Sequence, residues 1–301
     1  MAMDLRQLEY FVQVADHGSF TRASAYLRIA QPALSRQVRS LEIELRQSLM
    51  KRNGRGVTLT EAGQRLLAHA RGILQQVERA RLDLADPLGA TGGRLAIALP
   101  PSVSRTLTGP LVAAFRDQLP RATLSVVEGL SAYALEWLAI GRVDCAVVYN
   151  VTPSPAVDLL PVLDEPLFLV SARARRQPLE GPVLTLAELA EQPLVIPSRP
   201  HSLRMLVESA LAASARRARV ALEIESVPAM LDLVQQGGVH AVLAHNAIRT
   251  SGHESAFQLR PIGQPPLTAT LWIATSAQRP RGPLIDQAIR LVREQLLSLW
   301  A

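Results

Sequence analysis

The sequence of 301 residues contains a single cysteine, Cys145. One thiol cannot close a disulfide within the chain or build a cysteine zinc site, so both kinds of cross-link are excluded. The chain has no run of 18 uninterrupted apolar residues, and its first seven residues, MAMDLRQ, are interrupted by charged and polar side chains. These absences predict neither a membrane span nor a secretory leader, so we expect a cytoplasmic protein.

Motifs of the common enzyme classes are also missing. We find no Gly-x-Ser-x-Gly elbow, no P-loop, no His-Glu-x-x-His and no dinucleotide-binding glycine fingerprint. His240 and His245 are five residues apart, which on a strand places them on opposite faces and does not suit a metal. The sequence therefore predicts no catalytic residue, no metal ligand and no cofactor.

Proline and net charge divide the chain unevenly. Pro32 is the only proline before Pro87, although the chain contains 21 prolines. Residues 17–60 hold eight basic and two acidic side chains, which equals the whole formal net charge of +6. Such a segment can be a solvated basic face, but it is also what binding to an anion or to nucleic acid requires.

The composition and the first 59 residues predict a small helical domain in front of a larger one. The length and the 48% hydrophobic content suffice for two or three buried cores. Apolar residues recur at helical spacing over 4–16, and further helices are expected over 21–27 and from Gln31 onward, where Pro32 falls in the first turn. Ser19 or Thr21 can cap the second helix, and a tight turn joins it to the third. This arrangement is typical of a helix-turn-helix.

The outer face of the third helix suits the major groove of DNA. Arginine and glutamine can bind base edges in pairs of hydrogen bonds, and a helix N-terminus attracts phosphate. The two glycines of the basic stretch 51–59 suit the tip of a hairpin, a wing, from which arginine can reach phosphate or a minor groove. We expect DNA contacts from ten residues: Ser19, Thr21, Arg22, Gln31, Pro32, Ser35, Arg36, Arg39, Arg52 and Arg55.

Three stretches carry a family resemblance. Residues 18–24 (GSFTRAS), 30–42 (AQPALSRQVRSLE) and 55–63 (RGVTLTEAG) closely resemble the LysR-type transcriptional regulators. The sequence departs from the family pattern twice. Arg46 stands where the family usually has glycine, which puts the usual left-handed turn in doubt, and Met50 stands where the family has an aromatic residue, although it should still fill the core.

Residues 60–88 predict a linker helix. Apolar residues follow one another at steps of three and four from Ala62 to Leu84, and glycines and Pro87 end the pattern. The resemblance implies that this helix pairs with its copy in a second subunit, which sets two DNA-binding domains at a fixed spacing. The alternative is packing against the C-terminal domain of the same chain.

Residues 92–301 alternate short apolar runs with helical stretches, which predicts a parallel α/β sheet. Strands are expected over 94–99, 123–128, 144–149, 166–171, 194–196, 220–225, 239–244 and 268–275, and helices over 105–117, 132–140, 202–213, 228–236 and 283–299. The resemblance implies a two-lobed effector domain similar to periplasmic binding proteins. Lobe 1 would comprise residues 92–162 and 267–301, and lobe 2 residues 163–266. Cys145 is expected to be inert core.

Ligands of open α/β sheets bind beyond the carboxyl ends of the strands. We therefore expect effector contacts from the residues that follow those strands, among which serines at helix starts can bind a carboxylate. Simple helix capping is the alternative for each serine. The expected contacts are Ser102, Val103, Ser104, Ser131, Tyr149, Asn150, Ser198, Arg199, His201, Ser202 and His245.

The sequence thus predicts a promoter-binding transcriptional regulator, an activator by the habit of the family, that senses a small molecule between two lobes. Its expected partners are double-stranded DNA, the effector, RNA polymerase and further copies of the chain as a homodimer or homotetramer. An enzyme built on the α/β portion and a solute-binding protein for transport are the alternatives. The fused helix-turn-helix and the missing leader oppose the second of these.

Overall fold

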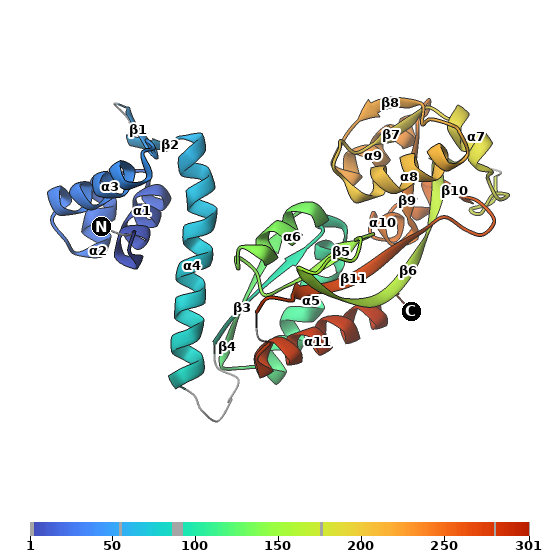
Figure 1. Cartoon of the computed structure of the whole chain (residues 1–301). Helices are drawn as coiled ribbons and strands as arrows, with labels where there is room; N and C mark the ends of the chain where they lie inside the picture. Colours follow the sequence, from blue (N-terminus) through green and yellow to red (C-terminus); the bar gives the residue numbers. More distant parts are fainter. Residues whose placement is uncertain (1–2, 54–55, 86–92, 175–176, 280, 301) are drawn as a thin grey trace. The chain divides into compact units, whose positions relative to one another are not determined.

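The structure is a computed structural model that describes residues 3–53, 56–85, 93–174, 177–279 and 281–300. The chain divides into two compact units, the first of residues 1–90 with 139–142 and the second of the remainder. Figure 1 labels the helices and strands of both units. The first contains α1 (Leu5–His17), α2 (Phe20–Leu27), α3 (Gln31–Leu45), β1 (Met50–Asn53), β2 (Gly56–Leu59) and α4 (Glu61–Ala85).

The core of the first unit follows the apolar periodicity of its helices. Leu8 and Phe11 of α1 pack with Leu34 and Val38 of α3, and each is at most 2% exposed. The predicted core role of Met50 is confirmed, since it is 8% exposed in the same cluster.

Local capping explains where α2 and α3 begin and end. Ser19 caps α2 by accepting a hydrogen bond from the backbone N–H of Arg22, which decides between the two predicted caps. Arg46 ends α3 with φ 52° and ψ 34°, and its N–H donates to the carbonyls of Glu42 and Ile43. The doubt about this turn was therefore wrong: the left-handed turn forms with arginine in place of glycine, because these two hydrogen bonds hold it.

The wing and the long helix are joined to this core by backbone contacts. Strands β1 and β2 form an antiparallel hairpin, and the N–H of Val57 donates to the carbonyl of Gly18 at 2.9 Å. The Thr60 hydroxyl accepts from the N–H of Gly63 at 3.0 Å and so caps α4. Ala70 is fully buried in the core of the first unit, whereas Ile73, further along the same apolar stripe, is 36% exposed. The early part of the stripe therefore packs inside its own unit.

The second unit matches the predicted alternation with three additions. Helices α7 and α10 and strand β10 had not been predicted, and α5 begins at Pro101, four residues before its predicted start. The elements are β3 (Gly93–Leu99), α5 (Pro101–Gln118), β4 (Ala122–Glu128), α6 (Ser131–Ala139), β5 (Cys145–Tyr149), β6 (Val157–Ala172), α7 (Leu186–Glu191), β7 (Leu194–Ile196), α8 (Ser202–Ala213), β8 (Val220–Glu223), α9 (Val227–Gln236), β9 (His240–Ala244), α10 (His245–Arg249), a 3-10 turn (Glu254–Ala256), β10 (Phe257–Pro261), β11 (Thr268–Ser276) and α11 (Pro283–Trp300).

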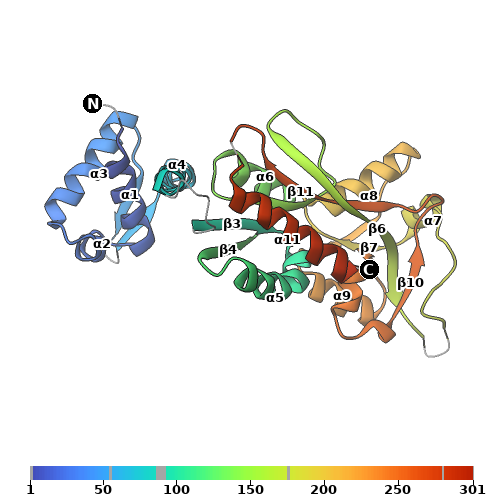
Figure 2. The ribbon, with the colours of Figure 1, turned by 90° about the horizontal axis from the view of Figure 1, so that it is seen from below.

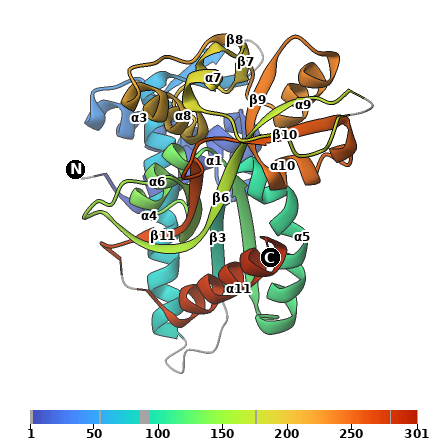
Figure 3. The same ribbon diagram turned by 90° about the vertical axis from the view of Figure 1, so that its right-hand side faces the viewer.

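The strands hydrogen-bond in the order β4-β3-β5-β11-β6-β9-β7-β8, and β10 pairs with β6. β3 is parallel to β4 and β5, and β7 is parallel to β8 and β9, as predicted. The prediction of an all-parallel sheet is wrong for β6 and β11, which run antiparallel to their neighbours. Figure 3 shows β6 running from one lobe of this unit into the other. The chain returns along β11, so these two strands must run in opposite directions.

Each lobe is a sheet covered by helices on both faces. Leu95 and Ile97 of β3 pack with α5 and α11. Ala96 and Ala98, which alternate with them along the strand, pack with α6 on the opposite face, as the two-residue period of a strand requires. Figure 2 shows α5 and α11 side by side. In the other lobe, α7 and α8 cover one face, and α9 and α10 cover the opposite one.

The two lobes meet along β6. Residues 157–166 of this strand pair with β11, and residues 167–170 pair with β9. Glu165 and Leu167 therefore lie where the strand passes from one lobe to the other. Cys145 is 1% exposed in β5, and burial raises the pKa of its thiol, so the prediction of an inert core cysteine is confirmed.

Candidate functional site

The first candidate site is the outer face of α3. Leu34, Val38 and Leu41 of this helix are buried, whereas Arg36 and Arg39 are exposed on its other side. The helix begins after Ala30 without a side-chain cap, and Pro32 in its first turn has no N–H. The start of α3 therefore offers a positive helix end and two guanidinium groups to the same surroundings.

The structure places the remaining predicted DNA contacts as follows. Ser19 is the cap of α2, and Thr21 and Arg22 are exposed in the first turn of that helix. Gln31 and Ser35 are half-buried on α3. Arg55 lies outside the described residues, and so does the side chain of Arg52.

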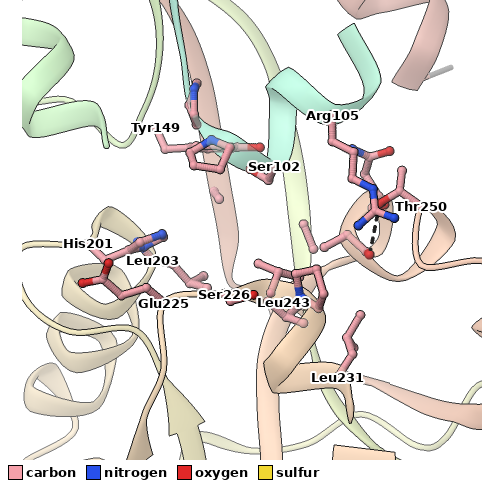
Figure 4. A pocket seen from close by; sticks show the side chains of 18 of the residues that line it. Ser102, Arg105, Tyr149, His201, Leu203, Glu225, Ser226, Leu231, Leu243 and Thr250 are labelled. Atoms are coloured by element: carbon pink, nitrogen blue, oxygen red, sulfur yellow. Dashed lines mark hydrogen bonds between the residues drawn. The ribbon is translucent and has the colours of Figure 1, made fainter. Parts of the chain in front are cut away.

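The second candidate site is a cavity of about 660 Å³ in the second unit. One wall consists of the first turn of α5, the loop after β4 and the end of β5, as Ser102, Leu130 and Tyr149 indicate. The opposite wall consists of the starts of α8, α9 and α10. Glu165 and Leu167 line the cavity from β6, at the crossing between the lobes. Figure 4 shows side chains from both walls facing one another.

The cavity brings together six of the eleven predicted effector contacts and leaves five outside its lining. Those that line it are Ser102, Ser131, Tyr149, Asn150, His201 and Ser202. Val103 is fully buried in the core of its lobe. Ser104 donates to a carboxylate oxygen of Glu128 at 2.7 Å, Arg199 forms a salt bridge with Glu208, and His245 interacts with Glu254 at 2.8 Å. Ser198 is half-buried outside the lining.

The three serines at helix starts are not simple caps. Ser102 is the second residue of α5, whose cap is Pro100, and its hydroxyl lowers the pKa of Tyr149 against the effect of burial. Ser131 accepts from the backbone N–H of Tyr149 at 2.9 Å. Ser202 begins α8, whose cap is His201. The capping alternative therefore does not explain Ser102 or Ser202.

A buried carboxylate forms the back of the cavity. Glu165 is 5% exposed; it accepts from the Tyr149 hydroxyl at 2.7 Å and from the indole N–H of Trp300. Burial raises the pKa of Glu165, and the two donated hydrogen bonds partly oppose this rise. Burial and the neighbouring Glu165 charge also raise the pKa of Tyr149, which therefore stays protonated as a donor.

A histidine stands at the start of α8. His201 Nδ1 accepts from the N–H of Leu203 at 3.2 Å, so the ring is unprotonated at this nitrogen. Burial lowers the pKa of His201, and the carboxylate of Glu225 opposes this effect. Figure 4 shows Glu225 beside the His201 ring. The cavity thus has a neutral donor–acceptor ring next to a carboxylate.

Sequence reasoning missed several residues of the cavity. Arg105 was taken as the start of a helix, but α5 begins four residues earlier, so Arg105 projects from its second turn. The largest missed group comes from α9 and the loop before it, which lie outside the strand ends that were searched. These residues are Glu225, Ser226, Val227, Pro228, Leu231, Asp232 and Gln235. Their spacing of three and four along α9 was the available signal, because it marks one helix face.

The cavity can bind a small molecule. It combines apolar side chains with hydroxyls, amides and charged groups, as ligand sites do. Among the described residues, no group of three or more His, Cys, Asp and Glu is placed to hold a metal ion. No helix of the described chain is long and apolar enough to cross a membrane.

Comparisons with known proteins identify the two parts of the chain that carry these candidate sites. Residues 5–64 match the bacterial regulatory helix-turn-helix protein, lysR family, and residues 89–297 match the LysR substrate binding domain. The nitrogen assimilation regulatory protein nac of Klebsiella aerogenes is 36% identical over 298 residues, 99% of this chain and 95% of that protein. The DNA-binding transcriptional dual regulator OxyR of Escherichia coli is 32% identical over 67% of this chain and 66% of its own length.

The fold has a solved counterpart. A full-length OxyR variant from Pseudomonas aeruginosa superimposes with a TM-score of 0.70 at 22% identity, over 98% of this chain and 95% of that one, and it shows the shared fold. The matched families and relatives are regulators, so the enzyme and transport alternatives are set aside. The chain belongs to the LysR family of transcriptional regulators, with a DNA-binding helix-turn-helix module and a substrate-binding domain.

Proposed function

We propose that this regulator reads promoter DNA with α3 and the β1–β2 hairpin, and that the cavity between its two lobes holds the controlling small molecule. The observation that carries the first part is the exposed basic face of α3 opposite a buried apolar face. The observation that carries the second is the cavity of about 660 Å³ at the crossing of β6. Because the DNA-binding elements and the cavity belong to different units, a ligand in the cavity can control DNA binding without itself contacting DNA.

Arg36 and Arg39 are the DNA contacts with the strongest structural support. They are three residues apart on the exposed side of α3, and their long guanidinium side chains can form paired hydrogen bonds with base edges in the groove. Thr21 and Arg22 lie in the first turn of α2, where they suit contacts to the phosphate backbone. The described first unit contains no acidic partner for these four side chains, so their hydrogen-bonding groups are available.

The chain acts in this proposal as a homodimer or homotetramer in the cytoplasm, where its DNA partner is found. Ile73 and Ala80 of the later apolar stripe on α4 are exposed and Val77 is half-buried, which suits pairing with a second copy. A dimer places two α3 helices on the two halves of a pseudo-palindromic site. Closure of the lobes on the effector then changes the relative orientation of the copies. This change alters DNA bending and the access of RNA polymerase to the promoter, and so activates transcription.

The helix N-termini around the cavity favour an effector that carries a carboxylate group. α5, α6, α8 and α9 all begin at the cavity wall, and Ser102 and Ser202 lie in the first turns of two of them. Helix N-termini favour negative charge by a few tenths of a kcal/mol to about 1 kcal/mol each. A carboxylate near Ser102 is therefore stabilised by the wall of lobe 1.

A gel-shift experiment on the DNA upstream of the chain's own gene tests the DNA part. We expect specific binding that weakens steeply with salt, since phosphate neutralisation releases counterions. Arg36→Ala should weaken specific binding by tenfold or more, because a good base contact contributes about 1–3 kcal/mol. Arg293→Ala, an exposed arginine of α11, is the matched control and should change nothing. Equal affinity of the Arg36→Ala variant and the wild type would contradict the assignment of α3.

A further inference from the structure

The charges that line the cavity do not match a simple carboxylate ligand. Four carboxyl groups line it against one guanidinium group, that of Arg105. Two of the carboxyl groups are already engaged: Glu165 accepts from Tyr149 and Trp300, and Glu128 accepts from Ser104. The other two, Glu225 and Asp232, belong to the wall of lobe 2.

Glu225 and Asp232 are available to a ligand. Both side chains are exposed and line the cavity, and among the described residues neither forms a salt bridge. Asp232 lies on the face of α9 that also brings Leu231 and Gln235 to the cavity, and Glu225 lies in the loop just before that helix. The neighbouring His201 has an unprotonated Nδ1 and a lowered pKa, so it does not neutralise the pair near pH 7. This wall therefore presents negative charge to whatever the cavity holds.

The wall of lobe 1, by contrast, favours a ligand group that accepts hydrogen bonds or carries negative charge. The side-chain Nδ2 of Asn150 is buried without a hydrogen-bond acceptor among the described residues, whereas its Oδ1 accepts from the N–H of Thr270 at 2.8 Å. Asn150 lines the cavity together with Ser102 and Arg105. A buried donor without a partner costs about 1–3 kcal/mol, so a ligand oxygen that reached Nδ2 as the lobes closed would be favoured. This end of the cavity therefore favours a carboxylate or carbonyl oxygen.

We propose that the effector carries a protonated amine in addition to a carboxylate, and that Glu225 and Asp232 bind the amine while the wall of Ser102, Arg105 and Asn150 binds the carboxylate. The ligand class is thus a small amino acid or a related zwitterion. A ligand of this kind spans the two lobes with opposite charges and favours their closure. A ligand with a carboxylate alone would leave both acids of lobe 2 unpaired and would be repelled by them. This inference rests on the proposed function, because it specifies the occupant of the same cavity.

Matched sets of small molecules test the inference on the purified full-length chain. Each set contains an amino acid, the acid without its amine and the amine without its carboxylate. Suitable sets are phenylalanine, 3-phenylpropanoate and phenethylamine, and leucine, 4-methylpentanoate and isopentylamine. Extending the amino acids to all twenty, thermal shift first identifies binders, because a ligand of the folded state raises the melting temperature. Calorimetric titration then gives the affinity of each member of a set.

We expect at least one amino acid to bind tenfold or more tightly than its partner without the amine. Glu225→Gln and Asp232→Asn should each remove most of that difference and leave the affinity for the acid without the amine unchanged. Neither carboxylate forms a salt bridge with the described residues, so both variants should fold; their melting temperatures without ligand verify this. Glu191→Gln, an exposed acid of α7 in the same lobe and outside the cavity lining, is the control and should behave like the wild type.

The outcomes separate this inference from the proposed function. If the acids without amine bind as tightly as the amino acids, or if the two variants keep the full preference for the amine, the amine inference is overturned and small-molecule sensing stands. If no compound of any set or any amino acid binds, both are overturned for the cavity. The gel-shift result on promoter DNA is independent of either outcome.

Discussion

Two arginines adopt a backbone conformation that is more usual for glycine. Arg28 and Arg46 end α2 and α3 with φ values of 55° and 52°. A side chain in this region costs free energy that glycine does not. Arg46→Gly should therefore stabilise the first unit by up to about 1 kcal/mol, partly offset by the greater freedom of glycine in the unfolded chain. Scanning calorimetry should show the melting temperature rise. Gln37→Gly, at an exposed position inside α3, is the control and should lower it by a similar amount.

His201 gives the second unit a specific pH dependence. Its pKa in the folded protein is lowered by burial, so the native state binds fewer protons at this ring than the unfolded state. The corresponding stability is present above the unfolded pKa near 6.5 and is lost as the pH falls through that value toward the lowered folded pKa. Protonation also removes the Nδ1 acceptor that caps α8, an interaction that typically contributes about 1 kcal/mol.

His201→Asn should keep the cap and remove this part of the pH dependence. Thermal unfolding between pH 7.5 and pH 5.5 should show a smaller loss of melting temperature for the variant than for the wild type. Parallel curves for His201→Asn and the wild type would rule out His201 as the source.

At the scale of elements, the junction between the wing and α4 depends on one glycine. A Cβ built at Gly63 would lie 2.0 Å from the carbonyl oxygen of Leu49, so a side chain there must displace backbone. Gly63→Ala should destabilise the first unit by about 1–3 kcal/mol, as overpacking does. Gly109→Ala is a matched control inside α5, because its new Cβ would meet nothing within 4 Å. That variant should change the free energy of unfolding far less than Gly63→Ala, since the helix preference of alanine is offset by Pro110, which disfavours the helical conformation of a preceding residue with a Cβ. Urea unfolding of the two variants gives the free energy of unfolding of each.

The elements that could be predicted are those with a local signal. Strand β7 and helix α8 were predicted to the residue, because a short apolar run and a clear helix start mark them. Strand β6 was predicted only in its last third, because Pro161 and Pro166 interrupt its pattern and its pairing depends on a distant strand, β11. The cavity residues Ser102 and Tyr149 follow from the rule of strand ends. Glu225 was missed because the strand was expected to run over 220–225; β8 ends at Glu223, so Glu225 lies just beyond its carboxyl end. Asp232 could not be found by that rule, since its position depends on how α9 packs across the sheet.

At the scale of the whole molecule, the crossing strand links the cavity to the contact between lobes. Tyr149 lines the cavity and donates to Glu165, which also accepts from Trp300 near the end of α11. Arg249 of α10, from the other lobe, donates to the carbonyl of Leu299 next to that tryptophan. A ligand that draws Ser102 or Tyr149 toward itself therefore acts on the hydrogen bonds that hold α10 and α11 together.

If DNA binding and ligand binding use separate sites, one substitution should weaken ligand binding alone and a different one should weaken DNA binding alone. Ser102→Ala removes a hydroxyl from the cavity wall, so ligand-induced thermal stabilisation and the transcriptional response should fall severalfold. Its affinity for promoter DNA without ligand should equal that of the wild type. Arg36→Ala should show the reverse, with DNA binding reduced and ligand-induced stabilisation intact. Ser214→Ala, an exposed serine outside the cavity lining, controls for loss of a hydroxyl. Equal loss of DNA binding in Ser102→Ala would show that Ser102 has a structural role and would contradict the separation.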